Sequence, residues 1–444
     1  KKKRMKTSVE NMSKYDQNAL AMNRRNVIWL SVSFSFIYFG INTFKSFAVP
    51  FLGNLGSMCL GILYAVSAVA SFFVPMILYL AKSEIGCLMV SGFAMVVYLL
   101  LYVYLIPGVT VVMSFLAGVF FSISWAVQSI LIAKNSVDEN RGFNSNLFYG
   151  IFMVGNVFGN VFAYIILDVM EVDVHGNSHG WNGGMSILFI GLSIFALIGS
   201  FLMFNIKKNL PTSPSEKVEV VATEPQAETK TICRTTCQKI GIVFRCLIEP
   251  RMLLLIVYFI NNGYAQVLVS TQVTRQIQSV KLVGLAMAVF AIVEVLTTGI
   301  LAQVSDKAGH FLIGVIGLIA EVLACVSTYY MNEYQSWLVY LPPVFFAVMD
   351  TVYQTECMSI VGRFFDDELE NAASTYRLIQ GIGSSICSYV TPLFVSQGAS
   401  ASTPSQLIAE MAVALILALV GYILLCVFLI LFKKPKDIIP TPEK

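Results

Sequence analysis

Charged side chains within long apolar segments are the residues of this sequence best able to do chemistry. Glu294, Glu321 and Asp350 each fall near the middle of such a segment. A charge at the centre of a bilayer costs about 2.5 to 3.5 kcal/mol on the insertion scale, so each acid needs a partner, a water-filled cavity or a function. Proton or cation binding is a candidate role of Glu294 and Asp350. The alternative for each is a neutral, hydrogen-bonded structural acid.

Uncharged polar residues in the same segments are the second set of candidates. The polar stretch 261–266 contains Gly263 and weakens a helix where transporters often unwind to present carbonyl groups to substrate. Flexible packing accounts for that stretch equally well. Asn156 and Asn160 lie one helical turn apart, beside two glycines. This pattern favours close helix packing with amide hydrogen bonds. The candidates for lining a substrate or ion cavity are Asn160, Asn262, Gln266, Gln128 and Gln354.

A second group of charges suggests a latch between neighbouring helices. Glu356 lies six residues beyond Asp350, roughly 9 Å further along a helix. Arg377 falls at a similar depth in the next apolar segment. We therefore expect an ion pair between Glu356 and Arg377, with Arg363 as a competing partner and a substrate contact as the alternative role. Lys45, near the outer end of the first segment, is expected to extend its amine towards the surface.

Catalytic and metal-binding patterns are missing from the sequence. There is no phosphate loop, no nucleophile elbow and no cluster of metal ligands. His175 and His179 stand in a glycine-containing stretch that we expect to be a solvated loop. The spacing of Cys233 and Cys237 lacks the second ligand pair of a zinc site. We expect neither an enzyme nor a bound metal or cofactor.

The segments that must position these residues are those of a membrane protein. Of 444 residues 57% are hydrophobic and 12% are charged, whereas soluble domains have about 25% charged residues. This composition disfavours a soluble enzyme, a nucleic-acid-binding protein and a secreted disulfide scaffold, and the apolar runs lack the alternation of an outer-membrane barrel. Twelve stretches approach the length of about 20 residues that a spanning helix needs. They lie near 27–48, 58–80, 85–106, 109–133, 143–167, 184–206, 249–271, 282–303, 310–331, 337–360, 372–396 and 406–432.

The distribution of basic residues predicts the orientation. Nearly all of the 29 Lys and Arg residues fall in the tails and in the connections on one side of the predicted spans. Positive charge is retained in the cytoplasm, so both termini are predicted to be cytoplasmic. The first span is expected to serve as its own insertion signal. The sequence does not distinguish the plasma membrane from an endomembrane or endolysosomal location.

The chain divides at its midpoint. Residues 210–231 are rich in Pro, Ser, Thr and Glu and have no apolar periodicity, which is typical of a disordered linker. The predicted organisation is a basic tail, six spans, a cytoplasmic linker, six spans and a short tail. The corresponding ranges are 1–26, 27–206, 207–248, 249–432 and 433–444.

A loop between two spans of the second half carries a recognisable signature. Residues 302–310 read Ala-Gln-Val-Ser-Asp-Lys-Ala-Gly-His and resemble the signature loop of the major facilitator superfamily. The resemblance implies an all-α fold of two six-helix halves around a central cavity, and a gating loop that contains Asp306, Lys307 and Gly309. The equivalent stretch of the first half, 80–86, is only a remnant of the signature.

Several segments are also similar to the uncoordinated-ninety-three (Unc-93) family of that superfamily. Residues 350–355 match the family's Asp-x-x-x-Gln-Thr pattern, and residues 370–377 match its Glu-x-Ala-x-x-x-Tyr-Arg pattern. The family's Trp-x-x-Gln pattern is found at 125–128. Further similarities lie at 56–64, 71–75, 149–160 and 262–266. The chain departs from the family at 45–47, where it has Lys-Ser-Phe in place of Gln-Ser-Ser.

The resemblance implies a function exerted through other membrane proteins. Known members of that family are accessory subunits of potassium-channel complexes or escorts of receptors, and some are linked to potassium balance. The first hypothesis is therefore an accessory regulator or trafficking partner that offers surfaces to a channel or receptor within the lipid bilayer. The alternative is a secondary transporter of a small solute or monovalent cation, coupled to protons at Glu294 or Asp350.

Overall fold

The computed structural model describes most of the chain between Gln17 and Phe432. The described ranges are 17–137, 140–172, 183–207, 241–334, 337–365, 368–396 and 401–432; side chains at 141–142, 302–308 and 370 are excluded. The loop that holds His175 and His179 lies outside these ranges, as do Cys233 and Cys237 and most of both predicted tails. Within the described ranges every regular element is helical.

The first half forms a six-span bundle. Its longest element, α2, covers the first predicted span and continues beyond it at both ends. The second span is divided into α3, η1 and α4, with Pro75 near the start of the last piece. The bounds are α2 Gln17–Leu52, α3 Asn54–Ala70, η1 Ser71–Phe73, α4 Val74–Ala81, α5 Glu84–Leu100, α6 Pro107–Lys134, α7 Arg141–Val169, α8 Gly183–Leu202 and η2 Met203–Asn205.

The second half repeats this plan with two irregularities. A π-helical segment, η3, interrupts the seventh span, and α14 contains two spans that meet at Gly309, whose φ of 73° and ψ of 156° are not helical. The bounds are α11 Pro250–Leu253, α12 Ile256–Leu268, η3 Val269–Val273, α13 Thr274–Gln276, α14 Val280–Tyr334, η4 Trp337–Tyr340, α15 Leu341–Phe364, α16 Leu369–Val390, η5 Thr391–Phe394 and α17 Pro404–Leu431.

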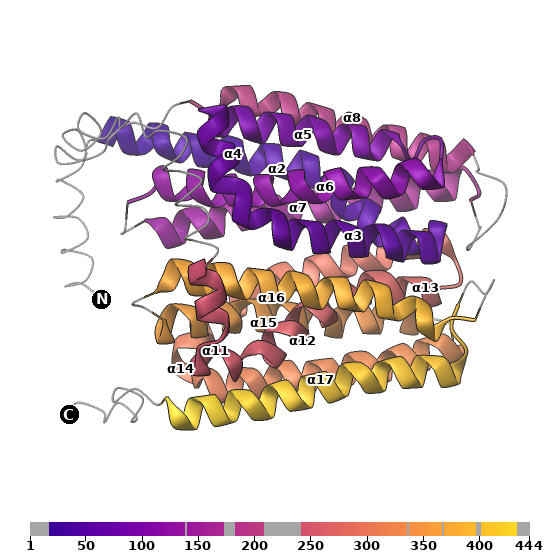
Figure 1. Cartoon of the computed structure of the whole chain (residues 1–444). Coiled ribbons are helices and arrows are strands. Elements are labelled where there is room, and N and C mark those ends of the chain that lie inside the picture. Colours follow the sequence, from indigo (N-terminus) through magenta and orange to yellow (C-terminus); the bar gives the residue numbers. More distant parts are fainter. Residues whose placement is uncertain are drawn as a thin grey trace.

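The two halves pack side by side with their long helices roughly parallel (Figure 1). α7 contacts α14, and α3 contacts α16, so these two pairs join the halves. The start of α2 and the end of α17 lie at the same end of the bundle, on the left in Figure 1, which we call the terminal end. α13 lies at the other end, which we call the opposite end.

The helices have the length and composition of membrane spans. In the described part of the chain, eight are long and apolar enough to cross a bilayer, and Glu84–Leu100 is a shorter apolar helix. The remaining predicted spans correspond to α12 with its extensions, α15 and α16, which carry the polar residues of the site. Helices satisfy their own backbone hydrogen bonds, which lipid cannot do for them. The fold is thus an all-α polytopic bundle, consistent with twelve spans.

Close approach of α7 to α2 depends on two glycines. A Cβ atom at Gly155 would lie 2.1 Å from the carbonyl oxygen of Ser35, and one at Gly159 would lie 2.5 Å from that of Phe39. Real Cβ atoms are not found at such distances, so only glycine permits this packing. The expected pattern of small residues on the fifth span therefore serves helix association.

Two predicted boundaries differ from the structure. Residues 17–26 belong to α2 rather than to a tail, and residues 241–247 of the predicted linker are helical. In the latter segment Val243 is buried against Ala68 of α3 and Leu378 of α16. The apolar residues at the end of the linker therefore pack against the bundle, which the composition of the preceding stretch did not indicate.

Candidate functional site

The centre of the bundle contains a pair of carboxyl groups. Glu294 of α14 and Asp350 of α15 are 8% and 5% exposed, and their carboxyl groups lie within interaction range of each other. Gln266 of α12 donates from Nε2 to Asp350 Oδ2 over 3.5 Å, and Gln354 is a further partner of Asp350. The structure thus brings together four of the residues that the sequence singled out, and all four belong to the second half.

Lys45 of the first half completes this cluster. Its Nζ lies 5.8 Å from the ring centre of Phe121 and 6.0 Å from that of Tyr64, and its charge acts on both Glu294 and Asp350. The expectation that Lys45 reaches the surface was wrong. α2 continues for seven residues beyond it to Leu52, so the lysine lies within the bundle. We call Lys45, Gln266, Glu294, Asp350 and Gln354 the central cluster.

A chain of polar side chains runs from the central cluster along α15 and α16. Gln354 Oε1 accepts a hydrogen bond of 3.1 Å from the hydroxyl of Tyr376 and one of 3.5 Å from Arg377. The Tyr376 hydroxyl in turn accepts one of 2.8 Å from Asn262 Nδ2. Arg377 also donates to Gln380 over 2.8 Å. Asn262 is therefore linked to the central cluster through Tyr376, a residue that sequence reasoning noted only within a family pattern.

The residues of the expected latch have other partners. Glu356 Oε1 lies 2.9 Å from His310 Nδ1, at the start of the ninth span, while Arg377 bonds to the two glutamines described above. The expected ion pair between Glu356 and Arg377 is thus replaced by a contact between spans nine and ten. The sequence placed His310 only in the preceding loop and gave it no partner.

Glu321 forms a separate structural site. It is fully buried and accepts hydrogen bonds of 2.9 Å from Asn261 Nδ2 and 2.7 Å from the Tyr353 hydroxyl. All three residues belong to the second half, on α12, α14 and α15. The geometry favours the structural role for this acid.

The two polar candidates of the first half have contacts within their own helices. Asn160 donates to the side-chain oxygen of Asn156 over 3.0 Å and to its carbonyl oxygen over 2.9 Å. Gln128 is 3% exposed and its Oε1 accepts a hydrogen bond of 3.2 Å from Ser129. The described hydrogen bonds do not connect either residue to the central cluster.

A buried cation beyond the predicted seventh span, 249–271, joins the halves at the opposite end. Arg275 of α13 is 2% exposed and donates to Asn54 Oδ1 over 3.1 Å and to Ser57 Oγ over 3.2 Å, both in the first half. Its charge also interacts with that of Glu410, a buried acid of α17 that accepts 2.7 Å from Thr391. Sequence analysis missed Glu410, although an acid one turn inside an apolar segment is a visible signal.

The two signature loops lie at the terminal end. Gly309 adopts a positive φ, as a tight turn requires; the side chains of Asp306 and Lys307 lie outside the described residues. In the first half Lys82 also has a positive φ. The Ser83 hydroxyl accepts a hydrogen bond of 3.0 Å from the backbone nitrogen of Gly86 and so caps α5. The remnant loop is therefore a well-formed turn.

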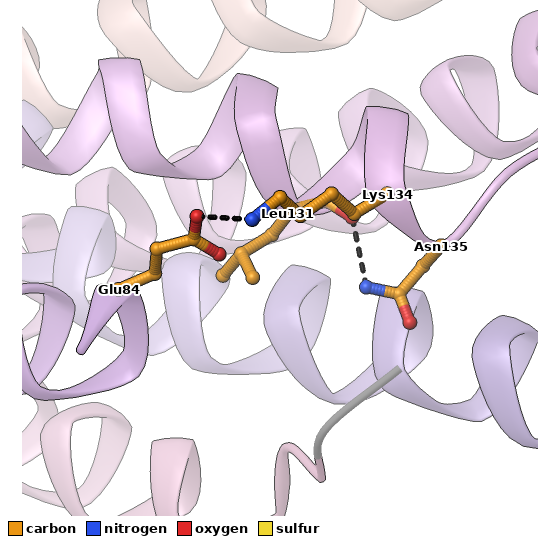
Figure 2. A network of polar contacts seen from close by, with 4 residues as sticks. All are labelled: Glu84, Leu131, Lys134 and Asn135. Atoms are coloured by element: carbon orange, nitrogen blue, oxygen red, sulfur yellow. Dashed lines mark hydrogen bonds and ion pairs between the residues drawn. The ribbon is translucent and has the colours of Figure 1, made fainter. Parts of the chain in front are cut away.

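An ion pair follows the first turn. Figure 2 shows Glu84 at the start of α5 paired with Lys134 at the end of α6, while the neighbouring Asn135 donates to the carbonyl oxygen of Leu131 over 2.8 Å. This pair joins spans three and four, just as His310 and Glu356 join spans nine and ten. In the first half the acid belongs to the earlier of the two spans, whereas in the second half it belongs to the later one.

The amino-acid sequence matches the profile of the Major Facilitator Superfamily over residues 30–386 and again over 251–444. The chain belongs to this superfamily. Solved structures of transporters have the same fold. A partially occluded inward-open structure of the xylose transporter XylE from E. coli has a TM-score of 0.64 at 11% sequence identity, and the match covers 94% of this chain and 99% of XylE. The nucleoside transporter NupG has a TM-score of 0.65 at 13% identity, covering 93% of this chain and 100% of NupG.

Within the superfamily the chain is similar to proteins of the Unc-93 type. It is 22% identical over 412 residues to the UNC93-like protein MFSD11 of Xenopus tropicalis, covering 81% of this chain and 88% of the relative. It is 23% identical to the unc-93 homolog A protein of Xenopus laevis, covering 84% of this chain and 88% of the relative. This member of the Major Facilitator Superfamily is an integral, multi-pass membrane protein.

Proposed function

We propose that this facilitator is an accessory regulator of an ion channel or a trafficking partner of other membrane proteins, as its Unc-93-like character suggests. The observation that carries the proposal is the position of Lys45 among two aromatic rings, within the electrostatic reach of Glu294 and Asp350. In this proposal the close pair of carboxyl groups carries one negative charge, because two adjacent carboxylates repel each other. Lys45 neutralises that charge from the other half.

Because Lys45 neutralises the carboxyl pair, the central cluster needs no bound solute or ion to balance its charge. The amine and the carboxyl pair come from different halves, so their attraction favours one relative position of the halves. A partner that binds the lipid-facing surface senses that position. In this proposal both termini are cytoplasmic, the protein is no enzyme, and the membrane is the plasma membrane or an endomembrane.

A second candidate function is secondary transport of a monovalent cation or small solute. The polar chain from Asp350 through Gln354 to Arg377 and Gln380 favours it, because these groups continue from the carboxyl pair along two helices. Here a proton or cation would compete with Lys45 for the pair. Asn262 and Gln266 would line the path on α12.

One comparison distinguishes the two functions. Uptake of labelled potassium and of protons is measured in liposomes that contain only the purified protein, and potassium conductance is measured in cells with and without the chain. A regulator changes the conductance of cells but gives no uptake into liposomes. A transporter gives uptake that disappears in Asp350→Asn or Glu294→Gln.

The control variant is Glu321→Gln, which alters a buried acid outside the central cluster. Uptake into liposomes that is sensitive to Asp350→Asn and insensitive to Glu321→Gln would overturn the regulator. If the chain changes no conductance in cells and gives no uptake into liposomes, both ion-linked functions are excluded. The remaining function is trafficking, which is tested by measuring how much of each crosslinked partner reaches the cell surface.

A further inference from the structure

A pocket at the terminal end of the first half lies away from the central cluster. It has a volume of about 290 Å³ and is formed where α2 begins and α8 ends in η2. Its lining combines two cations and two amides with small or flexible apolar side chains. The lining residues are Ala21, Met22, Arg25, Asn26, Asn205 and Lys207.

The pocket has a fixed polar wall. Asn26 is 2% exposed, and its side chain accepts from the backbone nitrogen of Lys207 over 3.0 Å and donates to the Lys207 carbonyl oxygen over 2.9 Å. Asn26 Nδ2 also donates to Asn135 Oδ1, at the end of α6, over 2.9 Å. One buried amide thus holds the backbone of Lys207 against α2. This fixes the position from which the lysine side chain extends.

The cations of the pocket lack an acidic partner in the part of the chain that the structure describes. Arg25 and Lys207 are both exposed, and the described ion pairs involve neither. The surroundings therefore favour an anionic ligand.

Apolar residues that face outwards adjoin the pocket. Phe204, next to Asn205, is 65% exposed, and Ile28, one turn from Arg25 on α2, is 39% exposed. Residues three apart on a helix share a face, so Ile28 continues the surface of Arg25 towards the bilayer. A ligand that combines an anionic group with acyl chains would match both parts of this surface.

We propose that this pocket binds the phosphate-bearing headgroup of an anionic membrane lipid. Arg25 and Lys207 contact the phosphate oxygens, Asn205 supplies a further hydrogen bond, and the acyl chains run along Ile28 and Phe204. Basic pockets between spanning helices at the membrane surface recognise such headgroups. The bound lipid would connect the end of α8 to the start of α2.

The test is thermal unfolding of the purified full chain in detergent, titrated with phosphatidylinositol bisphosphate and, as a reference, with phosphatidylcholine. A ligand that binds only the folded state raises the unfolding temperature. We expect the anionic lipid to do so and phosphatidylcholine not to. Arg25→Gln and Lys207→Gln should each weaken apparent binding about fivefold, since one cation near an anionic lipid is worth about that factor.

The matched control is Lys82→Gln, which removes one charge at the terminal end but outside the pocket. It should bind the lipid within twofold of the unaltered protein, and Arg25→Lys should retain most of the binding. Each variant is first compared without lipid, so that a loss of folding is recognised. Equal weakening by Lys82→Gln, or no weakening by either pocket variant, would overturn the proposal.

A titration with a soluble phosphate compound distinguishes a lipid ligand from a free one. Inositol trisphosphate carries the phosphate groups without acyl chains and should bind much more weakly than the lipid. Equal stabilisation by the soluble compound would overturn the lipid assignment and make the pocket a site for a free phosphate compound.

Discussion

Arg275 of the second half donates a hydrogen bond of 3.1 Å to Asn54 Oδ1 of the first half, although the two residues are 221 positions apart. The guanidinium group also reaches Ser57 and is almost completely buried. Nearby, Lys281 pairs with Asp168 across the same boundary, but both side chains of that pair are exposed. The buried contact therefore holds the halves together at the opposite end more strongly than the exposed one.

Arg275→Gln should loosen the opposite end. The shorter side chain loses two hydrogen bonds and leaves Asn54 and Ser57 without their partner, at a cost of about 1–3 kcal/mol in the free energy of unfolding. Accessibility is measured on the native Cys59, which is buried two residues beyond Ser57, with a membrane-impermeant maleimide, and the reaction should be faster when Arg275 is replaced. The other described cysteines are mostly buried, which limits background labelling.

Lys281→Gln serves as the comparison for this variant. An exposed ion pair contributes about 0–1 kcal/mol, so neither stability nor labelling of Cys59 should change appreciably. If Lys281→Gln accelerates labelling as much as Arg275→Gln does, the buried contact has no special role.

Gly155→Ala should destabilise the first half. The added methyl group would lie 2.1 Å from the carbonyl oxygen of Ser35, which forces α7 away from α2. Overpacking of this kind costs about 1–3 kcal/mol. Gly150→Ala, on the same helix, meets nothing within 4 Å and should change stability by less than about 1 kcal/mol. Unfolding temperatures in detergent compare the two, and similar values would contradict the packing described here.

Tyr353→Phe should destabilise the second half. It removes one of the two hydrogen bonds that Glu321 accepts, and an acceptor left unsatisfied in the interior costs about 1–3 kcal/mol. Tyr334→Phe is the control, because Tyr334 is 58% exposed and surface changes usually stay within about 0.5 kcal/mol. The measurement is the unfolding temperature, and a Tyr353→Phe protein as stable as the control would show that this hydrogen bond contributes little.

Lys45→Met and Asp350→Asn should be coupled. The first change leaves the carboxyl pair without its cation and should destabilise the protein, while the second removes the negative charge that the cation neutralises. The double variant should therefore be more stable than the sum of the single effects predicts, by about 1 kcal/mol or more. The same cycle with Glu321→Gln in place of Asp350→Asn should be additive, and additivity in both cycles would separate Lys45 from the central cluster.

Apolar length and charge distribution were sufficient to predict the bundle. Charged residues within apolar segments and the polar stretch of the seventh span then located the central residues, and Gln266, Glu294, Asp350 and Gln354 lie close together in the structure. These predictions succeeded because a charge in a span is costly and therefore conspicuous.

Partners that come from different halves did not follow from the sequence. The role of Lys45 depends on where α2 ends, and helix ends within apolar sequence are poorly marked. Arg275 falls outside the predicted span 249–271, but the π-helical segment before it extends the seventh span beyond the apolar run. Glu356 and Arg377 lie at similar depths, but depth does not specify rotation about the helix axis, and His310 occupies the position facing Glu356.

The division of the central charges between the halves has a consequence for biogenesis. During synthesis the first six spans enter the bilayer with Lys45 before Glu294 and Asp350 exist, so the amine lacks its counter-charge at that stage. The insertion scale assigns such a lysine about 2.5 to 3.5 kcal/mol at mid-membrane. The newly made first half must therefore be held by the insertion machinery or tilt its lysine towards water until the second half is made. A chain truncated after the sixth span would keep this uncompensated charge and should be recognised by membrane quality control.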